Sequence, residues 1–512
     1  MRTAYSRRDF IKKVGCTAAS LSLATCLLTG CNSQMRMVSA SPQAHLNKKN
    51  ILFLAIDDLR DYVNCLGGYE GKVYTPNIDK LAARGVLFTN AQCDSPACAP
   101  SRAAILSGLK PYSSGAYCNN HKLFMRSPIL SQCTTLSRHF MNNGYHAAET
   151  GKIHHELWLD YIGEADNWDE VFPSKSNCSV IGGWPPIGKK LPLRKSRKGT
   201  NVWDPVDFDW GPLSCGETDM PDWKQAEWIE EWLQRKHDKP FFLAYGTHMP
   251  HVPMYVPQKY FDMYPLQEIK LPTIRKNDLD DVPEMAQKLA NVGNGLNEIA
   301  TVDNDWKEPI QAYLAAISFV DDCIGKIIAA LDKSAYRDNT IIVFWGDNGW
   351  HLGEKTIWQK FSLWEESTRV PLIIAAPGVS RSGGKCSNPV NLSDIYPTLV
   401  ELCNLPQPQQ KLDGLSLRFL LENPNAKWER PALTSNSYKC YSLRFEQWRY
   451  TRYADGTEEL YDHENDPKEW NNLANIAEYN EIKKRCKKWL PEKNENPLEV
   501  IPIISPSKVI SG

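Results

Sequence analysis

The sequence lacks an excess of charge of either sign, since 59 Lys and Arg residues stand against 60 Asp and Glu residues among its 512. A strongly basic chain would be typical of a nucleic-acid-binding protein, so we expect no nucleic-acid partner. The 15 cysteines form no CxxC pair with metal-site spacing, and no internal repeat is visible. The composition, with 42% hydrophobic and 23% charged residues, is typical of a globular protein.

Long hydrophobic runs are also scarce. The paired Arg7 and Arg8 precede an apolar run at 18–28, a pattern typical of a twin-arginine export signal. A transmembrane helix needs about 20 apolar residues, and neither this run nor any later segment is long enough. The run ends in Leu28–Cys31 (LTGC), which resembles a bacterial lipobox.

These N-terminal features predict an exported bacterial protein. We expect residues 1–30 to be an export signal of the twin-arginine or lipoprotein type, and residues 31–47 to be a polar tether. The chain would engage the export machinery and reach the periplasm or the cell surface, with its only membrane contact through a lipid on Cys31. A plain secretory signal with an incidental Cys31 is the alternative.

The rest of the chain alternates between apolar runs typical of strands and amphipathic runs typical of helices. The predicted strands are 51–56, 145–149, 240–245, 340–345 and 370–376, and the predicted helices are 77–84, 135–143, 222–235, 308–331 and 392–403. This alternation predicts an α/β catalytic domain over residues 48–404, with a mostly parallel sheet and helices on both faces. A smaller α+β subdomain at 405–490 would contain an antiparallel sheet with strands at 441–445 and 448–453 and a last helix at 477–489, before a tail at 491–512.

Polar pairs follow two of the predicted strands. Asp57 and Asp58 come directly after 51–56, and Asp347 and Asn348 follow 340–345 after one glycine. Ligands of α/β sheets bind beyond the carboxyl ends of strands, and oxygen ligands suit a hard cation such as Ca²⁺ or Mg²⁺. Asp and Asn are also ordinary turn residues, so either pair alone would be weak.

Cys98–Arg102 (CAPSR) is the most specific motif in the chain. Pro100 suits the first turn of a helix, which would place Cys98 at the helix N-terminus, where backbone N–H groups favour an anionic ligand. Arg102 adds a permanent positive charge. A cysteine there is expected to have a lowered pKa and to act as a nucleophile, while a small buried cysteine beside a proline turn is the alternative.

Together these motifs resemble the type I, formylglycine-dependent sulfatases of the alkaline-phosphatase superfamily, whose signature is Cys-x-Pro-Ser-Arg followed by Ala103–Gly108 (AAILSG). The resemblance extends from about residue 49 to 473. It includes Thr75–Asp79, Gly151–His155, His248–His251, Gly346–Trp350 and Leu460–Asp466. The segments 248–253 and 349–360 look most like the iduronate-2-sulfatase branch.

The resemblance implies an alkaline-phosphatase-like fold and a role for each matching residue. Cys98 would be oxidised to Cα-formylglycine by a maturation enzyme, and one hydroxyl of its hydrate would attack sulfur before the other expels sulfate. Arg102 and Lys152 would hold this nucleophile, while Lys360 and His251 would bind the sulfate group and protonate the leaving oxygen. One Ca²⁺ would be held by Asp57, Asp58, Asp347 and Asn348 together with the residue at Cys98.

Two positions depart from a single family pattern. Many family members place a histidine two residues after the lysine, which is His154 here, whereas the iduronate branch places it three residues after, which favours His155. That branch also often has a histidine where this chain has Asn348, although an amide oxygen can equally bind calcium.

The expected substrate is a sulfated glycan or a small sulfate ester. Residues 189–198 carry six positive charges, flanked by Trp184, Trp203 and Trp210. They would either be a solvated loop or grip a polyanionic glycan, with tryptophans stacking on sugar faces. The alternatives for the whole chain are a phosphomonoesterase or phosphonate hydrolase of the same superfamily, and a non-catalytic glycan-binding lipoprotein. Neither would require Cys98 within this motif together with Arg102, Lys152 and Lys360.

Overall fold

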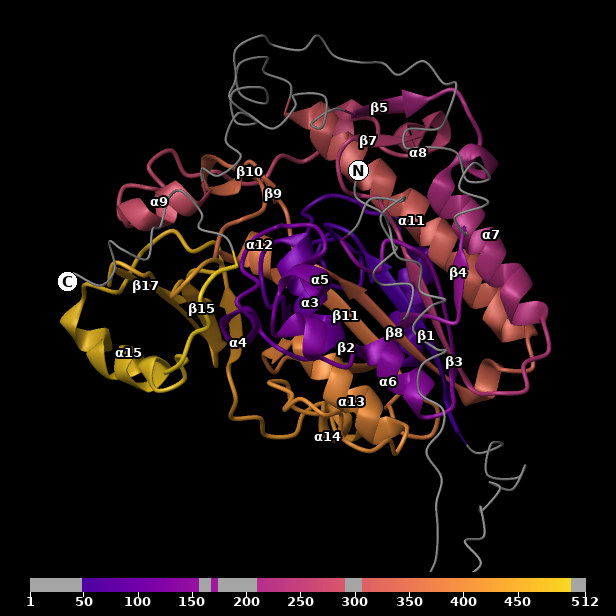
Figure 1. Cartoon of the computed structure of the whole chain (residues 1–512). Coiled ribbons are helices and arrows are strands. Elements are labelled where there is room, and N and C mark those ends of the chain that lie inside the picture. The colour runs from indigo at the N-terminus through magenta and orange to yellow at the C-terminus, as the bar shows by residue number, and fades with distance from the viewer. Residues whose placement is uncertain (1–47, 156–166, 174–209, 291–305, 499–512) are drawn as a thin grey trace, which may run out of the picture. The chain divides into compact units, whose positions relative to one another are not determined.

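The computed structural model describes residues 48–155, 167–173, 210–290 and 306–498 (Figure 1). Its main sheet has nine strands: β1 (Asn50–Ile56), β2 (Val86–Gln92), β3 (His146–Gly151), β4 (Glu170–Phe172), β6 (Phe241–Gly246), β8 (Thr340–Gly346), β11 (Arg369–Ala375), β12 (Gly384–Cys386) and β13 (Val390–Asn391). Their order is β12-β2-β11-β8-β1-β6-β3-β4, and β13 pairs with β2. Among the described strands of this sheet β11 alone is antiparallel to its neighbours, so the sheet is mostly parallel.

Helices cover both faces of this sheet (Figure 1). Successive residues of a strand point to opposite faces, so Leu52 and Leu54 join one buried apolar cluster while Ile51 and Phe53 join another. The first cluster includes residues of α2 (Pro76–Arg84), α7 (Pro221–Gln234) and α11 (Lys307–Lys333). The second includes residues of α3 (Cys98–Ser107), α6 (Leu136–Asn142), α13 (Ile395–Leu402) and α14 (Arg418–Glu422).

A smaller antiparallel sheet follows later in the chain. It consists of β14 (Ala432–Ser435), β15 (Tyr441–Phe445), β16 (Trp448–Arg452) and β17 (Glu458–Asp462), paired in chain order. The helix α15 (Asn480–Lys487) contributes Cys486 to a buried cluster that also contains Leu443 and Tyr450. The sequence therefore predicts both the architecture of the sheet-and-helix core and the antiparallel sheet near the C-terminus.

Shorter elements complete the described chain. Two small sheets are formed by β5 (Trp210–Leu213) with β7 (Met254–Pro257) and by β9 (His351–Leu352) with β10 (Trp358–Gln359). The short helices are α4 (Pro111–Ser114), α5 (Leu123–Arg126), α8 (Gln258–Asp262), α9 (Glu284–Ala290) and α12 (Glu365–Thr368).

Two predicted helices begin differently from the expectation. Segments 392–403 and 477–489 each start with a 3-10 turn, Leu392–Asp394 and Ala477–Tyr479, before α13 and α15. At the first turn the Asp394 carboxylate accepts a hydrogen bond from the N–H of Asn391 at 2.9 Å, and this cap fixes a separate start. The sequence analysis also misses β2, because Thr89 and Asn90 interrupt its apolar run.

Two further features concern membrane spans and disulfides. No helix within the described ranges combines the length and apolarity needed to cross a membrane. All eleven described cysteines carry free thiols, so no disulfide joins the described residues. The predicted export signal, the tether and Cys31 lie outside the described residues.

Candidate active site

Two acidic pairs meet at the carboxyl edge of the main sheet. β1 and β8 are parallel neighbours with Ile56 opposite Gly346, so Asp57 and Asp347 leave the sheet side by side. Both carboxylates are fully buried. The register of two parallel strands therefore brings together residues that lie 290 positions apart in the sequence.

Lys152 joins this edge from the next strands. β3 and β6 are parallel with Gly151 opposite Gly246, and the N–H of Lys152 donates to the Gly246 carbonyl at 2.9 Å. Gly151 has a φ of +79°, and a Cβ there would lie only 1.8 Å from that carbonyl oxygen. Only glycine permits so close an approach, so this position is required to place Lys152 at the site.

Asp58 turns sharply out of the sheet. Its φ of +55° lies in the left-handed region, which is uncommon for a residue other than glycine. Its N–H donates to Asp347 Oδ1 at 2.9 Å, and the N–H of Asn348 donates to the same oxygen at 2.8 Å. The Asn348 amide donates to Asp58 Oδ1 at 2.8 Å. These bonds fix the relative positions of the two acidic pairs.

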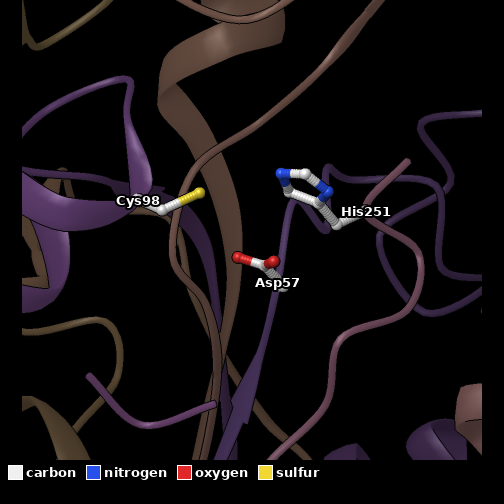
Figure 2. A group of neighbouring side chains, drawn as sticks. All are labelled: Asp57, Cys98 and His251. Carbon is white, nitrogen blue, oxygen red and sulfur yellow. The ribbon is translucent and has the colours of Figure 1, made fainter. Parts of the chain in front are cut away.

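Cys98 is the first residue of α3, and its sulfur points toward Asp57 (Figure 2). The sulfur lies 2.8 Å from Lys360 Nζ and 3.5 Å from Asp58 Oδ1. Burial raises the pKa of this thiol well above its ordinary value, and Asp57 and Asp58 raise it further against the effect of Lys152 and Lys360. The predicted lowering of this pKa is wrong, because desolvation and two carboxylates outweigh the nearby lysines.

Arg102 lies one turn further along α3 and binds two of the carboxylates. Its Nε donates to Asp347 Oδ2 at 2.7 Å, and its Nη2 lies 3.2 Å from Asp57 Oδ1. Burial raises the pKa of Asp347 to about 7 in spite of Arg102. For Asp57, the surrounding cations outweigh burial and hold the pKa well below its usual range.

Two lysines complete the charge balance of the site. Lys152 pairs with the second oxygen of Asp57, and Lys360 pairs with Asp58 Oδ1. With Arg102, the three positive side chains match the three carboxylates in number. Since unpaired buried charges are costly, this balance is what allows so many ionic groups to share a buried site.

The two adjacent histidines have different surroundings. His154 is 2% exposed, accepts a hydrogen bond from Trp168 Nε1 at 3.4 Å and meets the ring of Phe124 edge-on. Burial lowers the pKa of His155 well below its ordinary value, and Lys152 lowers it further. His155 therefore lies within the electrostatic influence of Lys152.

His251 follows β6 in the chain, and Figure 2 shows its ring across Asp57 from Cys98. Its Nε2 lies 3.6 Å from Asp58 Oδ2, and its side chain is 24% exposed. Asp222, at the start of α7, accepts hydrogen bonds from the N–H groups of His248 and Met249, both at 3.0 Å. The sequence analysis misses Asp222, because an acidic residue in the first turn of a helix is common and gives no separate signal.

The donor set fits a hard divalent cation. Single ligand atoms of Asp57, Asp58, Cys98 and Asp347 all lie within 4.8 Å of one another. Asp58 Oδ2 and Asn348 Oδ1 are buried without a hydrogen-bond partner, which is expensive unless a cation satisfies them. Three carboxylates and an amide oxygen are the ligands that Ca²⁺ and Mg²⁺ prefer.

The structure describes only one of the residues predicted to contact a glycan. The basic segment 189–198 with Trp184 and Trp203 lies outside the described residues. Trp210 is only 4% exposed, and its Nε1 donates to Glu308 Oε2 at 3.4 Å. The prediction that Trp210 stacks on a sugar is therefore wrong, because its ring is part of the core.

Known proteins are similar to this chain in sequence and in fold. A family profile described as Sulfatase matches residues 49–405, and one described as N-sulphoglucosamine sulphohydrolase, C-terminal, matches residues 353–496. A protein named Sulfatase from Formosa agariphila is 36% identical over 482 residues, covering 93% of this chain and 92% of that protein. Iduronate 2-sulfatase of Mus musculus is 31% identical, covering 70% and 69%.

Two solved structures show the same fold at low identity. A structure described as a 2-O GAG sulfatase matches with a TM-score of 0.63 and 23% identity, covering 86% of this chain and 90% of that one. Phosphonate monoester hydrolase of Agrobacterium radiobacter matches with a TM-score of 0.68 and 21% identity, covering 86% and 94%. The Sulfatase profile spans well over half of the sequence, and the chain therefore belongs to the sulfatase family of sulfuric ester hydrolases.

Proposed function

We propose that this sulfatase removes sulfate from sulfated carbohydrate, acting at chain ends, with a Cα-formylglycine made from Cys98 and one bound Ca²⁺. The observation that carries the proposal is the position of Cys98. Its sulfur lies at the N-terminus of α3, in contact with Lys360 and with Asp58 of the acidic cluster. A nucleophile placed there would face both a cation that binds sulfate oxygen and a metal.

The described residues suggest how the chain handles the sulfate group. The hydrate of formylglycine would supply a hydroxyl nucleophile, which Arg102 and Lys152 orient from the carboxylate side. Lys360 would neutralise the charge that builds on the sulfate oxygens. His251 would give a proton to the leaving oxygen, and we propose His155, which lies near the charge of Lys152, as the second histidine of the site.

Calcium would be held by the carboxylates of Asp57, Asp58 and Asp347 and the amide oxygen of Asn348. When bound, it would polarise a sulfate oxygen as a Lewis acid. Because the described carboxylates and cations already balance, a divalent cation would leave a net positive site that attracts a sulfate monoanion. The orphaned oxygens of Asp58 and Asn348 support this assignment.

For the substrate we propose a uronate 2-O-sulfate at the end of a glycan. This choice rests on the similarity to iduronate 2-sulfatase and to a 2-O GAG sulfatase. A phosphonate or phosphate monoester is the second candidate, since a phosphonate monoester hydrolase shares the fold. A sulfur centre is favoured by the family to which the chain belongs.

The test combines a mass measurement with a substrate panel. Protein co-produced with a formylglycine-generating enzyme is digested, and the peptide that contains Cys98 should show the aldehyde or its hydrate. The same protein is assayed on 2-O-sulfated uronates, sulfated galactosides, sulfated glucosamines, nitrophenyl sulfate and a phosphonate monoester. Full activity with an unmodified thiol would contradict the formylglycine proposal, and faster turnover of the phosphonate would favour the second candidate.

We further propose that the protein is exported and anchored by a lipid at Cys31. The proposal rests on the paired arginines, the apolar run and the LTGC segment. Fractionation of the native host should find the wild-type chain with membranes and Cys31→Ser in a soluble exported fraction. Equal distribution of the two would contradict the anchor.

A further inference from the structure

We infer that Tyr313 is a positioning residue for the metal site, which it serves by holding the turn that aims Asp58. The inference rests on the proposed metal site and adds a residue to it. Tyr313 lies on α11 and is fully buried, and it is not one of the residues proposed to act on the sulfate group. Its hydroxyl donates to the carbonyl oxygen of Asp58 at 2.6 Å and accepts from the N–H of Arg60 at 3.1 Å.

These two hydrogen bonds span the turn on both sides of Leu59. The turn begins with the left-handed φ of +55° at Asp58, a conformation that costs free energy for a residue with a side chain. Such a conformation persists only where surrounding contacts determine it. Tyr313 supplies the contacts to the backbone of this turn, while Asp347 accepts the N–H of Asp58 from the other side.

The consequence concerns the carboxylate of Asp58. Its Oδ1 accepts from the Asn348 amide and pairs with Lys360 Nζ. The backbone turn sets the position from which the side chain reaches these groups, and so helps to place Oδ2, which is buried without a hydrogen-bond partner 3.6 Å from His251 Nε2. A cation needs that oxygen in a fixed place before it arrives. Loss of the Tyr313 hydroxyl would let the turn relax. The free energy needed to order the site would then be spent when the cation binds, which lowers the affinity for the cation.

The side chain of Arg60 connects the same turn to a further part of the site. Its guanidinium donates to the carbonyl oxygen of Trp350 at 3.0 Å and to Glu354 Oε1 at 2.7 Å. The turn after β1 is therefore tied by Tyr313 to α11 and by the Arg60 side chain to the segment that follows Asn348. Tyr313 therefore contacts the turn at Arg60, the residue whose side chain makes the second connection.

The experiment compares Tyr313→Phe with Tyr264→Phe in the full chain. Tyr264 is a matched control, because its buried hydroxyl also accepts a backbone N–H, that of Tyr74, and contacts Ser318 of α11. Chelator-treated protein is titrated with calcium chloride, and binding is read by calorimetry and by the rise in Tm. Loss of one hydrogen bond should lower calcium affinity about 2- to 12-fold in Tyr313→Phe and leave it unchanged in Tyr264→Phe.

Each other outcome overturns the inference and shows what failed. Equal calcium affinity in Tyr313→Phe and wild type, with both phenylalanine variants less stable without calcium, would mean that Tyr313 has a structural role only. No calcium response in the wild type would remove the proposed metal site together with the inference. Binding by the wild type but not by Asp347→Ala keeps the site, so failure of the inference alone is distinguishable.

A second measurement covers the case in which Tyr313→Phe does not fold. Coupling between two sites is reciprocal, so calcium should strengthen the hydrogen bond that Tyr313 accepts. Hydrogen exchange at the Arg60 amide of the wild type should therefore slow in saturating calcium, while exchange at the Tyr74 amide should not. The same change at both amides would overturn the inference.

Discussion

The two halves of the site are held in place by different means. The strand-end half consists of Asp57, Asp58, Asp347 and Asn348, and the loop half is the segment 351–368 that carries Lys360. The strand-end half follows two parallel strands in register. The loop half has only short elements, namely a 3-10 turn, α12 and the two-residue strands β9 and β10. Four of its non-glycine residues adopt positive φ: Lys355, Thr356, Gln359 and Phe361.

Contacts from distant parts of the chain compensate for the irregular backbone of the loop half. Lys355 Nζ donates to Asp278 Oδ1 at 2.7 Å and to the carbonyl oxygen of Glu469. Arg449 of β16 pairs with Glu365 and with Glu469. Sheet register therefore positions the candidate metal ligands, whereas buried ion pairs with distant residues support the segment that carries Lys360.

The largest effect is expected at Cys98, which touches both halves through Asp58 and Lys360. Cys98→Ala should lower turnover at least about 10⁴-fold, because loss of a covalent nucleophile removes the reaction path. Cys93→Ala is the control, since Cys93 is equally buried but contacts the Ser367 carbonyl instead. Steady-state turnover and Tm of both variants check the prediction, and a loss of turnover in Cys98→Ala well short of about 10⁴-fold would contradict it.

Within the strand-end half, Asp347→Ala should lower turnover about 10³-fold, because a Lewis acid contributes several kcal/mol of charge stabilisation. It should also abolish the calcium-dependent rise in Tm and leave Arg102 without one carboxylate partner. Asp321→Asn is the control, since Asp321 is buried but binds the backbone of Asn77 at the start of α2. A full calcium response in Asp347→Ala would contradict this role.

The two buried lysines of the loop half are expected to have different roles, one in turnover and the other in stability. Lys360→Met should lower turnover about 10²-fold or more, since it removes a charge aimed at the reacting group. Lys355→Met should mainly lower stability, because it leaves Asp278 buried without its cation. Denaturant unfolding and turnover of both variants decide the matter, and an equal loss of turnover in the two would erase the distinction.

The strand-end half is also the part that can be predicted from the sequence. Apolar runs that end in Asp57 and Asp347 predict strands, and parallel strands share a carboxyl edge, so their meeting follows from general rules. The role of Cys98 is suggested by its motif, but its raised pKa is not, because the desolvation depends on residues from many segments.

The loop half cannot be derived in this way. Lys360 stands in a segment without helical or strand periodicity, so only the resemblance points to it. Its segment is contacted by Arg449 and Glu469, which lie about a hundred residues later and carry no local signal. The role of the Tyr313 hydroxyl cannot be predicted from the sequence either, since a tyrosine on the buried face of a helix is typical of any core.

The fourth prediction tests the ion pairs that support the loop half. Glu469→Gln should lower the free energy of unfolding by about 3–5 kcal/mol, because it leaves Arg449 buried with one partner fewer. Turnover per folded molecule should fall only a few-fold, since Lys360 is displaced rather than removed. Glu422→Gln is the control, because its pair with Arg418 is exposed and contributes about 0.3–0.5 kcal/mol. Urea unfolding measures both, and equal losses would contradict the support role.

The smallest effect is a pH dependence of stability at Glu366, a residue of the loop half that packs against Gly349. Burial, together with the neighbouring Glu354 and Glu469, raises the pKa of Glu366 to about 8 against the opposing effect of Arg60. A carboxyl group with a raised pKa binds its proton more tightly in the folded chain, so its contribution is present below about pH 4.5 and is lost as the pH rises to about 8. Glutamine mimics the protonated form. Glu366→Gln should therefore match the wild-type Tm near pH 5 and exceed it by several degrees near pH 9 in thermal scans. A gap that stays constant across this range would show that the carboxyl group keeps its charge, and the loop half would then tolerate one more buried anion than its ion pairs suggest.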